Sequence, residues 1–279
     1  MAQLQPVPGL AGYLPVAYRK GMKGPKKELG QHWLTDRTVL AAIAETAGIE
    51  QADTVLEIGP GLGTLTSELL RRAWRVVAVE FDPDLAEKLP GQFPGKNLGV
   101  HNEDVLSFDL DGLPEGYVVV ANVPYYITSK IVKKLMTARN KPRTAVLLVQ
   151  KEVAERICAE PGDMSILAVS AQVYASASLG IEVPRYLFTP PPQVDSRVVV
   201  LETRDRPLID TADEKAFFRM VKAGFSAKRK KLRSSLSGGL GIDKAAVEVL
   251  LQAAGVSPDA RAEDLSIDDW SRLTERFDG

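Results

Sequence analysis

Cysteine and histidine are scarce in this chain of 279 residues, which holds one cysteine, Cys158, and two histidines, His32 and His101. A single cysteine excludes an internal disulfide framework and is typical of proteins of the reducing cytoplasm. One cysteine and two histidines are too few for a typical zinc site, and they argue against a histidine-based catalytic triad. The sequence therefore predicts a cytoplasmic protein without a bound metal.

Long apolar runs are also missing, because no stretch of 18 or more apolar residues occurs. The start of the chain lacks the charged-then-apolar pattern of a secretory signal. These absences argue against a membrane partner. With 45% hydrophobic and 25% charged residues, the composition is that of an ordinary globular protein. The length allows one large domain or two smaller ones, and we expect a monomer.

Net charge is small, at −1, but the charges are segregated along the chain. Residues 126–151 hold seven Lys or Arg and residues 215–233 hold eight, and neither segment contains an acid. Residues 1–27 are also basic without an acid, whereas acids gather in residues 259–279. Such segregation can place a basic, nucleic-acid-binding face on a nearly neutral protein. Solvated helix faces are the alternative reading of each run.

The order of elements predicts an α/β fold. Short apolar strands alternate with helices from "LTDRTVLAAIAETAG" at residue 34 to "KEVAERICAEPG" at residue 151. This alternation indicates a Rossmann-like parallel sheet covered on both faces. After residue 205 we find no strong strand and expect three helices, at residues 213–226, 243–254 and 267–277. The predicted parts are a flexible basic arm (residues 1–27), a sheet domain (28–205) and a small helical domain (206–279).

Glycines and acids follow successive predicted strands. "EIGPGLG" at residues 57–63 ends one strand and opens a helix, and its Gly59 and Gly61 allow a ligand to approach the backbone closely. Glu80 ends the next strand and can accept both hydroxyls of a ribose. Asp104 ends the third and could accept from an adenine amino group, although Asp often caps a turn instead. The glycine spacing differs from G-x-G-x-x-G of dehydrogenases and suits the amino-acid end of S-adenosylmethionine.

A fourth predicted strand, residues 118–121, ends in Asn122-Val123-Pro124-Tyr125. This motif is similar to [DNS]-P-P-[YF], which recurs in methyltransferases that act on an exocyclic or amide nitrogen. In adenine the lone pair of the N6 amine is delocalised into the ring, so this nitrogen is a poor nucleophile. The Asn122 amide oxygen and a backbone carbonyl near Val123 and Pro124 can accept both N–H bonds and free the lone pair. Pro124 fixes the turn, and Tyr125 can stack on a base removed from its helix. These four residues are the predicted catalytic motif, although a plain strand-to-loop turn has similar residues.

With these motifs in order, the chain resembles the 16S rRNA adenine N6,N6-dimethyltransferase family over roughly residues 25–235. The matching segments include "KKELGQHWLTD", "VLEIGPGLGTLT", "ANVPYYITS", "SILAVSAQ" and "LFTPPPQVDSRVV". The resemblance implies an S-adenosylmethionine-dependent methyltransferase that dimethylates two adjacent adenosines near the 3′ end of 16S rRNA in the 30S subunit. It implies that Phe188 packs against the target base. The cofactor would be held by His32, Leu34, Gly59, Gly61, Glu80, Asp104 and Asn122.

The basic segment "GFSAKRKKLRSSL" is similar to one in the helical domain of that family, and it supplies the predicted RNA contacts, Lys228, Arg229, Lys230, Lys231 and Arg233. Two departures from the family occur: His32 replaces the commoner Asn and Trp33 the usual Phe, so we expect a modest change in cofactor affinity. Two alternatives stay open. One is a 23S rRNA adenine methyltransferase of the macrolide-resistance type, and the other is a ribosome-assembly factor that binds RNA with little catalysis.

Overall fold

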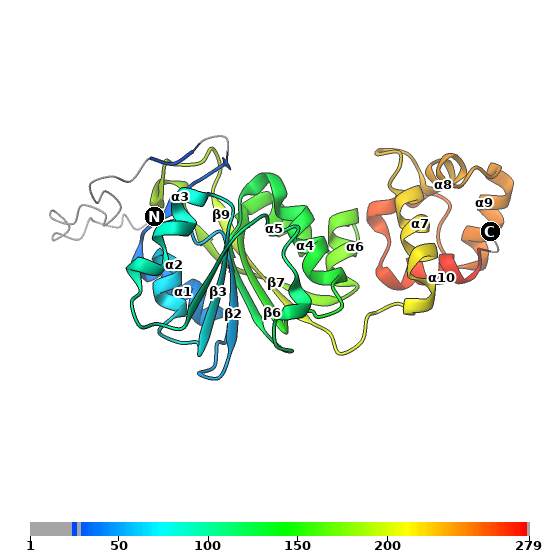
Figure 1. Ribbon diagram of the computed structural model, residues 1–279. Helices are drawn as coiled ribbons and strands as arrows, with labels where there is room; N and C mark the ends of the chain where they lie inside the picture. The colour runs from blue at the N-terminus through cyan, green and yellow to red at the C-terminus, as the bar shows by residue number, and fades with distance from the viewer. Residues whose placement is uncertain (1–23, 27–28, 278–279) are drawn as a thin grey trace.

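The computed structural model describes residues 24–26 and 29–277 and shows an α/β part joined to a group of helices (Figure 1). Most of the predicted arm, residues 1–27, lies outside the described residues. Seven strands form one sheet in the order β4-β3-β2-β5-β6-β9-β7. Their bounds are β2 (Thr54–Ile58), β3 (Arg75–Glu80), β4 (Leu98–Asn102), β5 (Val118–Asn122), β6 (Thr144–Gln150), β7 (Ala175–Val183) and β9 (Ser196–Thr203).

The first five strands are parallel, as the alternation of strands and helices predicts, but the sheet as a whole is mixed. β9 runs antiparallel between β6 and β7 and pairs with both. The predicted parallel strands are thus confirmed, and the two strands that the sequence did not predict make the sheet mixed. No elements were assigned between residues 163 and 205, because the long-range pairing that forms β7 and β9 leaves no strong local period. A separate two-stranded pair joins β1 (Trp33–Leu34) to β8 (Phe188–Thr189).

Helices cover both faces of the sheet, as expected for buried parallel strands. They are α1 (Arg37–Thr46), α2 (Thr64–Leu69), α3 (Pro83–Lys88), α4 (Thr128–Thr137), α5 (Lys151–Ile157) and α6 (Ile166–Gln172). Side chains of β2 alternate between the faces: Val55 packs with α1 and α2, and Leu56 packs with α4 and α6. Short 3-10 turns lie at Pro90–Gln92, Leu110–Gly112, Tyr125–Ile127, Arg185–Leu187, Thr211–Asp213 and Ala262–Asp264.

Four helices follow the sheet, where three were expected: α7 (Glu214–Gly224), α8 (Leu232–Leu240), α9 (Lys244–Ala253) and α10 (Ile267–Glu275). The missed helix, α8, has a glycine pair of low helix propensity near its end. Its Gly239 packs directly on α7, since a Cβ there would lie 2.6 Å from Cα of Ala223. Close helix packing therefore requires a residue that weakens the local helical signal.

The helical group lies beside the α4 and α6 side of the sheet (Figure 1). One apolar core runs continuously from Leu56 on the sheet to Trp270 in α10. Backbone amides of Gly162 and Met164 both donate to the carbonyl of Glu263, at 2.9 and 3.0 Å. These contacts hold the loop between α5 and α6 against the helical group. Among the described residues, no helix combines the length and apolar character needed to cross a membrane.

Candidate active site

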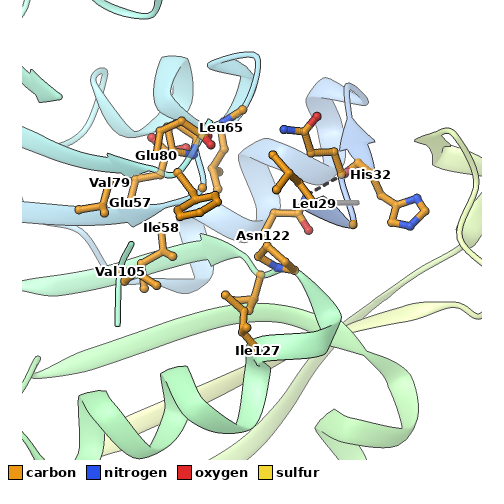
Figure 2. A pocket seen from close by; sticks show the side chains of 18 of the residues that line it. Leu29, His32, Glu57, Ile58, Leu65, Val79, Glu80, Val105, Asn122 and Ile127 are labelled. Carbon is orange, nitrogen blue, oxygen red and sulfur yellow. Dashed lines mark hydrogen bonds between the residues drawn. The ribbon is translucent and has the colours of Figure 1, made fainter. Parts of the chain in front are cut away.

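A cavity of about 310 Å³ opens at the carboxyl ends of β2, β3 and β5. Its volume is at the lower end of the range usual for small-molecule sites. Figure 2 shows Glu57 and Glu80 on one side of it and Asn122 and Ile127 across from them. Parallel strands end at one edge of a sheet, so residues separated by many positions in sequence meet here. All seven predicted cofactor residues line this cavity: His32, Leu34, Gly59, Gly61, Glu80, Asp104 and Asn122.

The glycine turn after β2 is held in place by Glu80. One carboxylate oxygen of Glu80 accepts from the Gly61 amide at 3.0 Å, and the other accepts from the Asp82 amide at 2.8 Å. Gly59 and Gly61 both have positive φ, at 67° and 57°, which favours glycine. Burial raises the pKa of Glu80 above its usual range. Each carboxylate oxygen can accept more than one hydrogen bond, so Glu80 keeps acceptor capacity toward the cavity.

Glu57 is a buried carboxyl group of the site. It lies in β2, is 1% exposed and lines the cavity. Neither of its carboxylate oxygens has a hydrogen-bond partner among the residues that the structure describes. Burial raises its pKa to about 8; the neighbouring Thr66 acts against this shift, and the nearby charge of Glu80 adds to it. A buried carboxyl without a partner is costly, so this geometry favours a ligand that brings a cation or a hydrogen-bond donor.

Asp104 follows β4 and combines the two roles considered for it. One of its oxygens, Oδ1, accepts from the backbone amide of Leu106 at 2.9 Å and so stabilises the turn. The residue also lines the cavity, which leaves Oδ2 to accept from a ligand. Within residues 24–26 and 29–277, no group of three or more His, Cys, Asp or Glu side chains is placed to hold a metal ion.

The Asn122 amide is oriented by His32, the residue that precedes β1. Its Nδ2 donates to the backbone carbonyl of His32 at 3.1 Å, which leaves Oδ1 to accept from a substrate. The turn that follows is fixed by two backbone bonds. The Val123 amide donates to Leu148 of β6 at 3.1 Å, and the Ile127 amide donates to the Pro124 carbonyl at 3.2 Å. The Pro124 carbonyl keeps a second lone pair for a donor in the cavity.

Tyr125 is held on two sides at the start of the 3-10 turn 125–127. Its hydroxyl forms a 2.7 Å hydrogen bond with the Ser196 hydroxyl. The ring of His32 lies nearly parallel to the Tyr125 ring, with centroids 5.8 Å apart. His32 Nδ1 in turn lies 2.7 Å from the Pro190 carbonyl. The ring of Tyr125 is therefore fixed beside the cavity rather than mobile at its rim.

Phe188 is the exception among the predicted catalytic residues, because it does not line the cavity. It belongs to β8, pairs with Leu34 of β1 and is only 2% exposed within the core. In this conformation its ring has no free face for a base. Sequence reasoning also missed residues that do line the cavity, among them Trp33, Glu57, Phe81, Val105, Leu106 and Tyr126. An acid within the apolar strand "VLEI" was the available signal for Glu57.

The predicted RNA-contacting cations lie away from the cavity, around the loop between α7 and α8. Lys228, Arg229 and Lys230 are exposed in this loop. The two remaining cations pair with acids of the same helical group. Lys231 contacts Asp259 at 2.6 Å, and Arg233 contacts Glu248. All five basic residues are therefore exposed, and part of their charge is already balanced.

Comparison with protein families gives one extensive match. The model of the family described as "Ribosomal RNA adenine dimethylase" matches residues 22–278. The chain is 42% identical over 258 residues to "Ribosomal RNA small subunit methyltransferase A" of Dehalococcoides mccartyi (strain CBDB1), which covers 91% of this chain and 89% of that protein. It is 39% identical over 275 residues to the protein of the same name from Moorella thermoacetica, with 94% and 95% covered.

Solved structures of rRNA methyltransferases share the fold. The chain superposes on the 23S rRNA methyltransferase ErmE with a TM-score of 0.72 and 35% identity, covering 88% of this chain and 100% of that one. A dimethyladenosine transferase from Plasmodium falciparum gives a TM-score of 0.75 at 28% identity, with 87% and 96% covered. Both matches extend well beyond the sheet and include the helices that follow it.

Proposed function

The chain belongs to the ribosomal RNA adenine dimethylase family, and we propose that it dimethylates N6 of two adjacent adenosines near the 3′ end of 16S rRNA. The observation that carries this proposal is the Asn122–Tyr125 turn at the edge of a cofactor-sized cavity. Its amide oxygen and carbonyl can accept hydrogen bonds from the exocyclic amine of adenine, and its ring can stack on the base. The chain is thus an S-adenosylmethionine-dependent rRNA adenine dimethyltransferase, and the cavity is where its cofactor binds.

The residues present fit this cofactor. S-adenosylmethionine brings an ammonium group, two ribose hydroxyls and an adenine amine, all of which are hydrogen-bond donors. The cavity offers matching acceptors: the unpartnered carboxyl of Glu57, the oxygens of Glu80 and Oδ2 of Asp104. We assign these to the ammonium, the ribose and the adenine, in that order along the strand ends. When bound, the cofactor supplies an electrophilic methyl group on its sulfonium.

Catalysis by this chain is mostly orientation. Asn122 Oδ1 and the second lone pair of the Pro124 carbonyl accept the two N6 hydrogens, which draws the nitrogen toward tetrahedral geometry. The lone pair then points at the methyl group instead of into the ring. Because the Asn122 amide is held by the His32 carbonyl, no reorganisation is needed when the base enters. The methylated nitrogen loses its proton readily, so no strong base is required.

Tyr125 provides the stacking surface for the target base. Its ring is fixed by Ser196 and backed by His32, so stacking costs little side-chain entropy. Phe188 remains a predicted second aromatic contact. Since its ring is buried in β8, that role requires residues 188–190 to move when RNA binds.

The choice of 16S over 23S rRNA is supported by sequence similarity. The curated relatives named as small-subunit methyltransferases are about 40% identical to this chain, and the match covers roughly nine-tenths of their length. ErmE, a 23S rRNA methyltransferase, shares the fold at 35% identity. We propose that the helical part, residues 206–279, selects the RNA and that Lys228, Arg229, Lys230, Lys231 and Arg233 contact its phosphates. Such contacts make affinity depend on salt, while the shape of the RNA gives selectivity.

We further propose that the substrate is the assembled or assembling 30S subunit, met by a monomer of this protein in the cytoplasm. The test is methylation of purified, under-methylated 30S subunits with labelled S-adenosylmethionine, with 50S subunits and 23S rRNA in parallel. Nucleoside analysis should find N6,N6-dimethyladenosine in 16S rRNA alone. Label in 23S rRNA would instead support the resistance-type reading. Cofactor binding without label in either RNA would support a role in assembly.

A further inference from the structure

Two neighbouring tyrosines at the catalytic turn have opposite environments. Tyr125 is tied to Ser196 and backed by His32, whereas Tyr126 is 64% exposed, although it also lines the cavity. A large ring left in solvent costs hydrophobic free energy unless something covers it when the protein works. The ring of Tyr126 therefore stands at the mouth of the site as an uncovered aromatic surface.

The backbone of Gly30 lies beside the ring of Tyr126 and does not cover it. Gly30 has a φ of +61°, and a Cβ built on it would lie 3.4 Å from Cδ1 and 3.5 Å from Cε1 of Tyr126. The ring edge thus rests against a residue that has no side chain. Most other residues at position 30 would be strained at this φ.

A cation accompanies the ring. Lys130 lies four residues after Tyr126, in the first turn of α4, where it is exposed and also lines the cavity. An aromatic face next to a lysine is the combination by which proteins hold single-stranded nucleotides: the ring stacks on a base, and the cation meets a phosphate. The hydrogen bonds that fix the Asn122–Tyr125 turn involve neither of these two side chains.

We infer that Tyr126 and Lys130 bind the nucleotide next to the target, with the neighbouring adenine stacked on Tyr126 and its phosphate near Lys130. This inference rests on the proposed function, in which two adjacent adenosines are modified in turn. While one adenine is bound at Tyr125, the neighbouring adenine loses its stacking partner. The neighbouring adenine must then be bound outside the cavity. The exposed ring of Tyr126 gives that second base a place at the mouth of the cavity.

The test uses the full chain and under-methylated 30S subunits, and it measures kcat and KM separately. Tyr126→Ala should raise KM for the subunit roughly 5- to 100-fold, the range expected for loss of one base-stacking surface. Tyr126→Phe keeps the stacking face and should restore KM to within about two-fold of the wild-type value. Lys130→Gln should raise KM and reduce its dependence on salt. Binding of S-adenosylmethionine, measured by calorimetry, reports on the cofactor site independently.

Trp74 supplies a matched control, because it is 67% exposed and lies at the amino end of β3. The cavity lies at the other, carboxyl end of this strand. Trp74→Ala should leave KM unchanged. The decisive arm replaces the neighbouring adenosine with an abasic nucleotide in reconstituted 30S subunits. On that substrate, Tyr126→Ala and the wild-type protein should have the same KM.

The inference is overturned if Tyr126→Ala leaves KM unchanged, if Tyr126→Phe is as defective as Tyr126→Ala, or if the abasic substrate still distinguishes the variant. Failure of the proposed function would look different. In that case the wild-type protein itself would place no label in 16S rRNA, whatever residue stands at position 126.

Discussion

Glu57 offers a sharp test of the cofactor site, because its carboxyl is buried without a partner. We consider Glu57→Gln, which keeps the shape of the side chain and removes its charge. Burial raises the pKa of Glu57 from 4.5 to about 8, so the folded state holds this proton to a higher pH than the unfolded chain does. The stabilising contribution is complete below about pH 4.5 and is lost as pH rises toward 8.

The size of the effect follows from this difference in pKa. Between pH 5 and 8 the wild-type protein should lose roughly 3 kcal/mol of unfolding free energy that Glu57→Gln does not lose. Urea unfolding of the cofactor-free protein at pH 5, 6.5 and 8, followed by circular dichroism, measures it. Glu87→Gln, at an exposed carboxyl of α3, is the control and should parallel the wild type. Parallel curves for wild type and Glu57→Gln would refute the reasoning. Saturating S-adenosylmethionine should stabilise the wild type more than Glu57→Gln at pH 8.

Other predictions concern catalysis, RNA binding and packing. Asn122→Ala should lower turnover roughly 100- to 1000-fold while the melting temperature stays close to the wild-type value, and near-normal methylation of 30S subunits would contradict the assigned role. Replacing residues 228–230 with Gln should lower the slope of log affinity against log salt by about 2 to 3, whereas Lys231→Gln, which removes a cation paired with an acid, should change it less. Gly224→Ala should destabilise the protein by about 1–3 kcal/mol in thermal unfolding, because the new Cβ would lie 2.2 Å from the Trp270 ring. An unchanged melting temperature would show that α7 and α10 are packed more loosely than described.

The sequence could predict much of the cavity because its parts are local. Each parallel strand is recognisable from an apolar run, and the functional residue closely follows that run in the sequence. Gly59, Glu80, Asp104 and Asn122 were found in this way, and all of them line one cavity. What links them is a rule of topology, that parallel strands present their carboxyl ends at one edge. No knowledge of side-chain contacts was needed to predict their proximity.

Features that depend on long-range pairing could not be found in the same way. β1 and β8 pair across more than 150 positions, and this pairing buries Phe188 instead of presenting it to the cavity. β9 lies antiparallel between β6 and β7. This direction depends on its pairing with distant strands and cannot be read from its own composition. α8 has glycines where its neighbour α7 approaches closely. In each case tertiary contact overrides a weak local preference.

The residue before β1, His32, shows why a side chain other than the expected Asn is compatible with the Asn122–Tyr125 turn. The bond that orients Asn122 comes from the backbone carbonyl of His32, which any residue would supply. The side chain contributes separately, by covering one face of Tyr125 and by contacting the Pro190 carbonyl. A change from Asn to His thus preserves the hydrogen-bonding geometry of the amide while adding an aromatic backing to the stacking ring. The orientation of the Asn122 amide depends on the backbone of residue 32, and the support of the Tyr125 ring depends on its side chain, so the two can change independently.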